Sequence, residues 1–493
     1  MDITNKFWQL CHHLRHDGID SSDYIEQLTY LLFLKMVDEK GIHIPEGCDW
    51  KSLVKENDDN LVQYLDFILS NLQKEQGLLG AIFSEPVSRI KKGQSLRKII
   101  KLLEEIEWSL IKNDVIGIAF EELIGRVAND GKKGAGQYFT PRPLIQAIVE
   151  VIKPNPLASK DFKISDVACG TAGFLTVAAE WFQQNNNKTL SKAQELKIAN
   201  NTYFGTELVQ RPRRMALMNL FLHGIDASKT VQLNDSIDGV QDEIKFDLIL
   251  TNPPFGSKGS LPTNRKFPVK TGDKQLNFIQ HIIEKLKAGG KAAIVLPDSC
   301  LTSDKAKQVW SYYMDYAKSK ESVCNVHTVL KLPDGIFAAY ANGVKACVIF
   351  LNKGEKTDTL WMYDARKGVP KVTVKSNPLK EEHFQEFKAN FTNRVSSDRF
   401  KPHTLSEIKE KGFDLSFVEF IEPEPLKHPV VIIDEMIIYY EGKIKALKEL
   451  RTKLPLPNNY EQQIHEKADI AVTEISNQTN RRKAKRTLNG VLA

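Results

Sequence analysis

A series of short apolar segments that begins near residue 160 constrains the fold of this chain more than any other feature. Helical patterns separate most of these segments, which is typical of a mainly parallel sheet with helices on both faces. In chain order the segments are FKISDVA, NTYFGTEL, KTVQLND, FDLILTN, KAAIVLPDS, VHTVLKL and VKACVIFLN. Only PDGIFAAYANG separates the last two, so we expect an antiparallel pair at one edge of the sheet. The sequence therefore predicts an α/β, Rossmann-like fold.

The regions on either side of these segments predict further parts, because 493 residues are too many for one hydrophobic core. Residues 1–130 have helical patterns, and residues 131–355 hold the predicted sheet. Residues 356–430 have mixed patterns, and residues 431–493 combine a helix with a basic tail. That helix carries apolar residues at alternating steps of three and four: Ile433, Ile437, Tyr440, Ile444 and Leu447. Such spacing predicts a coiled-coil-like seam, with an ordinary surface helix as the alternative.

Composition excludes several classes of protein. The chain is 42% hydrophobic and 26% charged, as soluble globular proteins are, and no run of about 18 apolar residues would cross a membrane. The N-terminal sequence lacks a basic region followed by an apolar one, so we expect a cytoplasmic protein. Six scattered cysteines without a Cys-x-x-Cys pair predict free thiols and no metal site. The net charge of +6 permits a nucleic-acid partner without establishing one.

Unusual residues follow three predicted strands, at the edge where parallel sheets bind ligands. The GTAG turn at 170–173 would let a ligand approach the backbone closely. Glu207 could accept both hydroxyls of a ribose, but it lies 34 residues after Gly173 instead of about 20, which counts against a nicotinamide dehydrogenase. A plain turn and a surface glutamate are the structural alternatives. The candidate cofactor contacts at this edge are Asp166, Gly170, Thr171, Ala172, Gly173, Glu207 and Asp235, the last for an adenine amino group.

Upstream, GQYFTPRPLIQAIVEVI predicts a helix with Thr140 as its N-cap and Pro141 as its first residue. The free N–H groups at such an N-terminus could bind a carboxylate, for example that of an amino acid. Gln137, Tyr138 and Phe139 add an amide and two aromatic rings beside the cap, where a plain capped helix would not need them.

The segment TNPPF at 251–255 ends the fourth predicted strand with two residues that cannot donate to a sheet. We expect the side-chain oxygen of Asn252 and the carbonyl of Pro253 to bind the two hydrogens of an adenine amino group. Such bonds favour a pyramidal nitrogen with a localised lone pair, which is the state that attacks a methyl group. Pro254 would keep this turn rigid, and Phe255 would stack on the extruded base.

The four motifs GQYFTPR, DVACGTAGFL, FGTEL and TNPPF, in this order, resemble the modification subunits of type I restriction–modification systems. These proteins are N6-adenine DNA methyltransferases that use S-adenosylmethionine. The resemblance implies their fold, with an N-terminal helical domain and a C-terminal helical extension. It also implies that Asn252 to Phe255 present the adenine, that Thr171 to Gly173 lie under the cofactor and that Glu207 holds its ribose. The residues implied at the methionine end are Gln137, Tyr138, Phe139, Thr140, Pro141 and Arg142.

The resemblance further implies a complex in which two modification subunits join one specificity subunit on double-stranded DNA, with endonuclease subunits added for cutting. The helix that begins near residue 433 is then a candidate for packing on the specificity subunit. The sequence contains no recognisable base-reading module, which fits this division of labour. The connection 256–274 is long and basic, so we expect it to contact phosphates unless it is merely a solvated loop. Its DNA-contact candidates are Lys258, Arg265 and Lys266.

Two rival functions stay open from the residues alone. The chemistry expected at Asn252 would also serve cytosine N4 in DNA or guanine N2 in RNA, and identification of the modified base separates these substrates. A non-catalytic DNA-binding scaffold subunit is the rival of a different class, and it would bind no cofactor.

Overall fold

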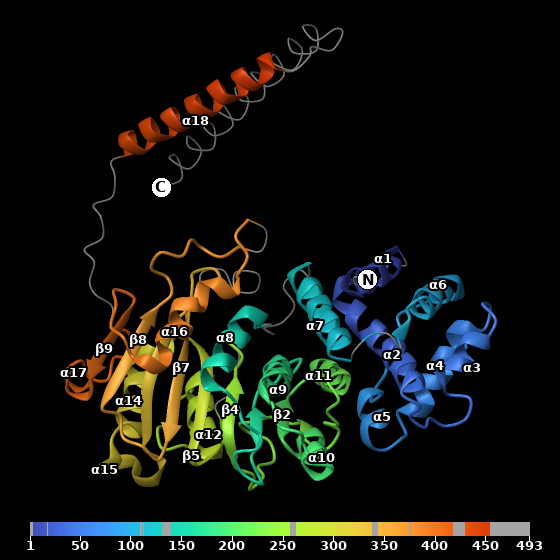
Figure 1. Ribbon diagram of the computed structural model, residues 1–493, viewed down its shortest axis with the longest axis horizontal. Coiled ribbons are helices and arrows are strands. Elements are labelled where there is room, and N and C mark those ends of the chain that lie inside the picture. The colour runs from blue at the N-terminus through green and yellow to red at the C-terminus, as the bar shows by residue number, and fades with distance from the viewer. Residues whose placement is uncertain are drawn as a thin grey trace, which may run out of the picture. The chain divides into compact units, whose positions relative to one another are not determined.

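The computed structural model of the chain (Figure 1) describes residues 3–16, 18–108, 111, 113–130, 140–256, 263–337, 344–373, 376–417 and 429–453. The chain divides into two compact units, residues 1–417 and 418–493, which are treated separately below. No helix among the described residues is long and apolar enough to span a membrane.

The first unit is built on one sheet of nine strands in the order β3-β2-β1-β4-β5-β7-β6-β8-β9. Strands β1 to β5 run parallel, and β7 lies antiparallel between β5 and β6. The strands are β1 (Ile164–Asp166), β2 (Tyr203–Glu207), β3 (Val231–Leu233), β4 (Phe246–Thr251), β5 (Leu286–Pro297), β6 (Cys324–Lys331), β7 (Ala346–Lys353), β8 (Thr359–Asp364) and β9 (Phe400–Thr404).

The seven strands predicted from the sequence are confirmed, and β6 and β7 do pair antiparallel. Their position at an edge is wrong, because β8 pairs parallel with β6 and β9 pairs with β8. Residues 359–404 therefore continue the sheet, and no separate mixed segment begins after residue 355. Pro402 cannot donate to a ladder and sits in β9, the last strand of the sheet, where one side has no neighbour to require it.

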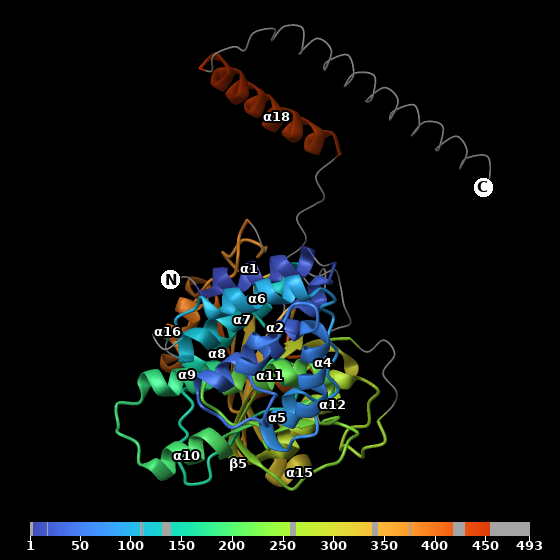
Figure 2. The ribbon, with the colours of Figure 1, turned by 90° about the vertical axis from the view of Figure 1, so that its right-hand side faces the viewer.

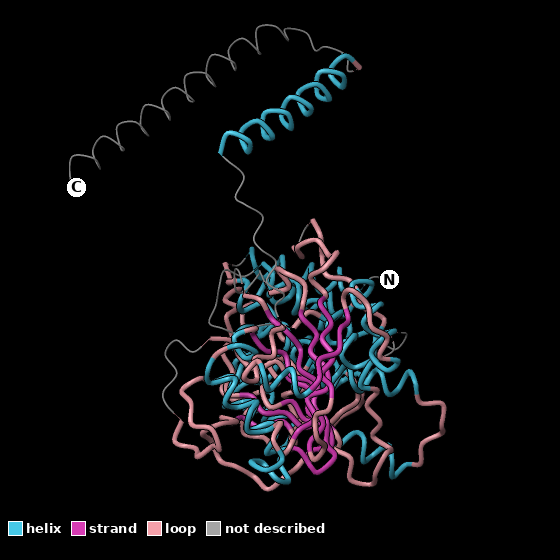
Figure 3. The backbone as a smooth tube through the Cα atoms, turned by 90° about the vertical axis from the view of Figure 1, so that its left-hand side faces the viewer, coloured by secondary structure: helices cyan, strands magenta, loops and turns pink. Residues whose placement is uncertain are grey.

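Both faces of the sheet are buried, as the apolar runs predict. Leu248 and Leu250 of β4 belong to one hydrophobic cluster, whereas Ile249 between them belongs to the other. The first face is covered by α8 (Arg142–Ile152), α9 (Gly173–Asn185), α11 (Gln210–Leu222) and α16 (Gln385–Asn393). The second face is covered by α12 (Lys274–Lys285) and α14 (Asp304–Tyr313). Figure 3 shows the strands gathered between these helices.

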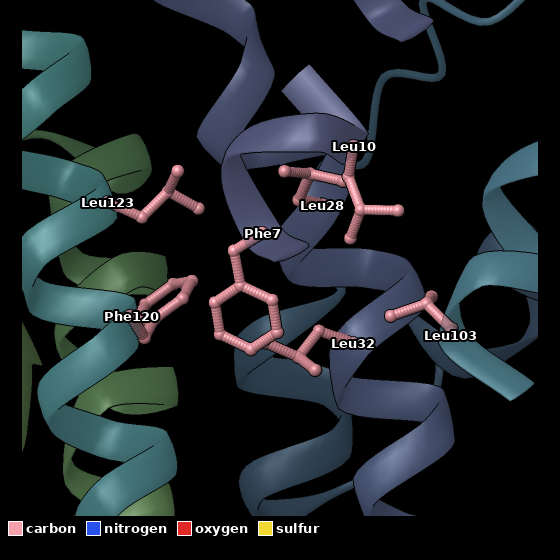
Figure 4. Close-up of a pocket in the computed structure, with 7 residues that line it drawn as sticks. All are labelled: Phe7, Leu10, Leu28, Leu32, Leu103, Phe120 and Leu123. Atoms are coloured by element: carbon pink, nitrogen blue, oxygen red, sulfur yellow. The ribbon is translucent and has the colours of Figure 1, made fainter. Parts of the chain in front are cut away.

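The N-terminal region is helical, as expected, and Figure 2 views the molecule from this side. Side chains from α1, α2, α6 and α7 point toward one another in its apolar core (Figure 4) and leave no space for a water molecule. Its helices are α1 (Ile3–His16), α2 (Ser21–Glu39), α3 (Trp50–Lys55), α4 (Leu61–Leu72), α5 (Gly77–Ile82), α6 (Gly93–Glu104) and α7 (Asn113–Asp130).

This helical region and the sheet form one unit because α11 packs on both. Arg214 of α11 is 2% exposed, pairs with Glu26 of α2 and donates to the carbonyl of Ile82 at 2.7 Å. A buried arginine that is fully occupied in this way ties the two parts together. The predicted boundary near residue 130 therefore does not separate independent bodies.

The second unit contributes one described helix, α18 (Pro429–Thr452), where the coiled-coil-like seam was predicted. All five seam residues are exposed within the described chain, from Ile437 at 48% to Leu447 at 64%. The basic tail at 481–486 lies outside the described residues.

Candidate active site

The carboxyl ends of β1 and β2 meet at the GTAG turn. Gly170 has a φ of +52°, which favours glycine, and its N–H donates to Oε2 of Glu207 at 3.0 Å. The second oxygen of Glu207 accepts from the N–H of Val209 at 2.9 Å. A Cβ on Gly170 would meet no atom within 4 Å, so the space beside the turn is open. Two backbone N–H groups therefore hold Glu207 next to a turn that is open at Gly170.

Asp166 lies beneath this turn, at the end of β1, and is 2% exposed. Its Oδ1 accepts from the hydroxyl of Thr251 at 2.6 Å and from the N–H of Ala168 at 3.1 Å. The pKa of this carboxyl is raised to about 7, mainly by burial and in smaller part by the nearby charge of Glu207, against the effect of the two hydrogen bonds. Burial also raises the pKa of Glu207. Two carboxyls in this state are suited to a positively charged ligand.

The remaining residues of the turn pack tightly. Ala172 is buried with a φ of +66°, and its N–H donates to the carbonyl of Cys169 at 2.7 Å. Cys169 fills the space beside Gly205, where an added Cβ would lie only 2.9 Å from its sulfur. The carbonyl of Thr171 accepts from Asn219 at 3.1 Å. The contacts shown for Cys169 are therefore structural.

Asn252 follows β4 directly and is the next residue after Thr251, whose hydroxyl donates to Asp166. Its Nδ2 donates to the hydroxyl of Thr140 at 2.9 Å. Its Oδ1 is shielded from solvent and has no donor among the described residues. A buried amide oxygen without a donor costs about 1–3 kcal/mol, so this atom is an acceptor that a ligand could satisfy.

The predicted cap at Thr140 is wrong by one residue. The helix α8 begins at Arg142 with Pro141 as N-cap and has no side-chain capping bond. Thr140 is instead buried, and its hydroxyl accepts from Asn252, a residue 112 positions away in the chain. Gln137, Tyr138 and Phe139 lie outside the described residues.

Phe255 is 8% exposed, and Phe337 packs against it with the ring centroids 5.3 Å apart and the planes at 82°. Phe337 lies in the connection after β6 and is fully buried. Phe337 was not predicted from the sequence, although PDGIF, like NPPF, places an aromatic residue after a proline beyond a strand end.

The side chain of Arg142 belongs to a buried polar network. It pairs with Glu121 of α7 and Glu180 of α9, and His223 of α11 is 2.8 Å from Glu180. The ligand atoms of these two glutamates and His223 lie within 4.8 Å of one another, as in a metal site. The guanidinium of Arg142 pairs with both carboxylates, so the described network supplies a cation of its own to these residues. Sequence reasoning missed Glu121, because its partners come from three other helices.

The other predicted contacts have structural partners. Oδ1 of Asp235 accepts from the N–H groups of Ile237 at 2.8 Å and Asp238 at 3.1 Å and so closes a turn. The Arg265 side chain is 14% exposed and pairs with Glu284 at 2.7 Å, so its guanidinium is already bonded within the protein. Lys266 is exposed, and Lys258 lies outside the described residues.

The site as a whole brings five segments together: Thr140, the ends of β1 and β2, the end of β4, and the start of α12. It offers one buried carboxyl, that of Asp166, and one partly exposed carboxyl, that of Glu207, beside an open turn, and next to them one buried acceptor oxygen. This arrangement can hold a cationic ligand and present an amino group to it.

The chain is similar in sequence to known DNA methylases. The chain matches the N-6 DNA Methylase family over residues 111–428 and the HsdM N-terminal domain over residues 3–41. It is 35% identical to the type I restriction enzyme StySJI methylase subunit of Salmonella typhimurium and to the EcoKI methylase subunit of Escherichia coli K12. Each match covers 83% of this chain and 78% of the relative.

Solved structures share the fold. One chain, from work on complex assembly and conformational transition of the type I R-M system, has a TM-score of 0.72 and 26% identity. That match covers 91% of this chain and 97% of the solved one. A modification subunit of a putative type I restriction enzyme from Vibrio vulnificus has a TM-score of 0.69 and 22% identity, covering 87% and 99% of the two chains.

Proposed function

Since this chain belongs to the N-6 DNA methylase family, among the methylase subunits of type I restriction enzymes, we propose that the site around Asn252 carries out its reaction. The protein is an adenine-specific DNA methyltransferase and the modification subunit of a type I restriction–modification system. It works on DNA together with specificity and endonuclease subunits. The assignment of roles to residues is our proposal.

The observation that carries it is the buried Oδ1 of Asn252, which has no donor among the described residues. An adenine turned out of the helix would give this oxygen one hydrogen of its N6 amino group. The carbonyl of Pro253 would accept the other hydrogen. Both acceptors are fixed before the base arrives, so little reorganisation is needed when the nitrogen becomes pyramidal. Phe255 would contact the face of the base.

The acidic side chains beside Asn252 fit S-adenosylmethionine. When bound, this cofactor would supply a methyl group on a positively charged sulfur. Asp166 and Glu207 are two acidic side chains at one edge, which suits a ligand with a sulfonium and an ammonium group, and Glu207 would accept the ribose hydroxyls. The open space at Gly170 leaves room for close approach to the backbone. Thr171 and Gly173 would lie beneath the bound cofactor.

Lys266 is the described residue that remains a phosphate contact in this proposal, because it is exposed on the 256–274 connection and Arg265 is turned inward. The exposed seam of α18 suits a helical partner and is assigned to the specificity subunit.

Identification of the product tests the proposal. The complex with the specificity subunit is incubated with S-adenosylmethionine and DNA, and the DNA is digested to nucleosides. N6-methyladenine is expected. A modified cytosine, or no modified base from a complex that binds the cofactor, would contradict it.

A further inference from the structure

The catalytic turn is held by a buried glutamine that follows it in the chain. Gln275 is the second residue of α12 and is 3% exposed. Its Nε2 donates to the carbonyl of Pro254 at 2.6 Å and approaches that of Gly256 at 3.4 Å. The start of α12 is itself fixed, because Oδ1 of Asp273 accepts from the N–H of Leu276 at 3.0 Å.

Two of the five residues in the 252–256 turn cannot donate a backbone hydrogen bond. Pro253 and Pro254 have no N–H group, so neither can close the turn by a backbone hydrogen bond. Gly256 ends the turn with a φ of +100°. Because a glycine backbone is flexible, this residue does not make the turn rigid by itself. One side-chain amide that bonds the carbonyls on both sides of Phe255 supplies the missing restraint.

A second restraint acts on the opposite side of the same turn. The hydroxyl of Thr140 accepts from Nδ2 of Asn252 at 2.9 Å and so sets which way the amide faces. Thr140 therefore fixes the side chain of Asn252, and Gln275 fixes the backbone that follows it. What remains at Asn252 is Oδ1, the buried acceptor that lacks a donor among the described residues.

We infer that Gln275 is a positioning residue for methyl transfer, which acts by holding the 252–256 turn so that Oδ1 of Asn252 stays aimed at the substrate amino group. This inference rests on the proposed function. The amide of Gln275 donates to protein carbonyls, so Gln275 acts on the reaction only through the position of Asn252. Loss of such restraint disturbs alignment in the transition state more than it disturbs cofactor binding.

Gln275→Met tests the inference, because methionine has nearly the same length and no donor. The complex with the specificity subunit is used, and methyl transfer is measured in single turnovers so that product release does not hide the chemical step. We expect the transfer rate to fall about 10- to 100-fold, while the S-adenosylmethionine dissociation constant changes by less than about twofold.

Gln280→Met is the matched control. Gln280 is fully buried in the same helix, and its amide both donates to and accepts from the backbone of Val269 at 2.9 Å. It thus has the same structural role toward a different part of the connection. The transfer rate of this variant is expected to stay within about twofold of the unsubstituted protein, at a similar loss of thermal stability.

The outcomes separate the inference from the proposed function. A normal transfer rate in Gln275→Met, with Asn252→Ala inactive, would overturn the inference alone. The same holds if Gln275→Met and Gln280→Met lose activity in proportion to lost folded protein. Normal activity in Asn252→Ala would overturn the proposed role of Asn252 itself. If Gln275→Met does not fold, Gln275→Leu replaces it, since leucine also lacks N–H donors and introduces no charge.

Discussion

Single residues at the strand ends carry both chemistry and unfavourable burial. Oδ1 of Asn252 lacks a donor among the described residues, and Asp166 keeps a carboxyl in a nearly water-free place. Each arrangement costs folding free energy in the free protein, and each is relieved by a ligand of the matching kind. In the proposed function, the cofactor supplies the cation and the adenine supplies the amino group that relieve these costs.

Cofactor binding should release a proton from Asp166. Burial raises the pKa of its carboxyl from 3.8 to about 7, so at neutral pH part of the population is protonated. Between pH 3.8 and about pH 7, Asp166 is ionised in the unfolded chain and still protonated in the folded protein. Its contribution to the free energy of unfolding therefore falls as pH rises through this range. A bound cation favours the carboxylate, so cofactor affinity should rise with pH up to about 7 and then level off.

Calorimetry of S-adenosylmethionine binding at pH 7, in buffers with different ionisation enthalpies, measures this proton. The observed heat should depend on the buffer in the unsubstituted protein and should depend on it much less in Asp166→Asn. Equal heats in all buffers for the unsubstituted protein would show that Asp166 does not titrate on binding.

At the scale of elements, one buried network joins α7, α8, α9 and α11 beneath the GTAG turn. Asn219 donates to Glu121 at 2.9 Å and to the carbonyl of Thr171 at 3.1 Å, so the N-terminal helices reach the turn through two hydrogen bonds. Burial alone would lower the pKa of His223, but Glu180 and Glu121 raise it overall. The helical region thus supports the cofactor side of the site.

Glu121→Ala should destabilise the protein strongly, because Arg142 loses one of its two carboxylates and the fully buried Thr176 and Asn219 lose an acceptor. The expected loss in the free energy of unfolding is about 3–5 kcal/mol by denaturant titration. Glu122→Ala is the matched control: Glu122 is the next residue of α7, is exposed and bonds the hydroxyl of Thr4, so a loss of about 1 kcal/mol or less is expected. Similar losses in the free energy of unfolding for the two variants would show that the buried network does not stabilise the fold more than the exposed contact does.

Sequence patterns predicted the elements better than their partners. Strands buried on both faces leave continuous apolar runs, so β1 to β7 were predictable, and the positions of Asp166, Glu207 and Asn252 at strand ends followed from the parallel arrangement. The inward turn of Arg265 and the bond from Asn252 to Thr140 were not, since each depends on which distant segment fills the neighbouring space. The strand β8 and the edge strand β9 were missed because TLWMYD and FKPHT mix apolar and polar residues and are not continuous apolar runs.

At the scale of the whole molecule, the chain carries an exposed apolar seam on α18, separate from the unit that holds the site. The seam residues of α18 lie on one stripe, and each is about half exposed or more. An apolar stripe of this kind on a helix is suited to burial against partner helices.

Ile444→Asp should therefore weaken assembly with the specificity subunit and leave the fold of residues 1–417 intact. Lys445→Asp introduces the same side chain one residue off the seam and should assemble normally. Titration of each variant with the specificity subunit measures the affinities, and a loss of about tenfold or more is expected for Ile444→Asp alone. Equal affinities would remove α18 from the interface.

The single-turnover rate of methyl transfer by Asn252→Ala tests the central claim most directly. If the buried Oδ1 is the acceptor that prepares the adenine nitrogen, the rate should fall about 100- to 1,000-fold, while S-adenosylmethionine affinity and melting temperature stay near those of the unsubstituted protein. A rate within a few-fold of the unsubstituted protein would contradict the claim.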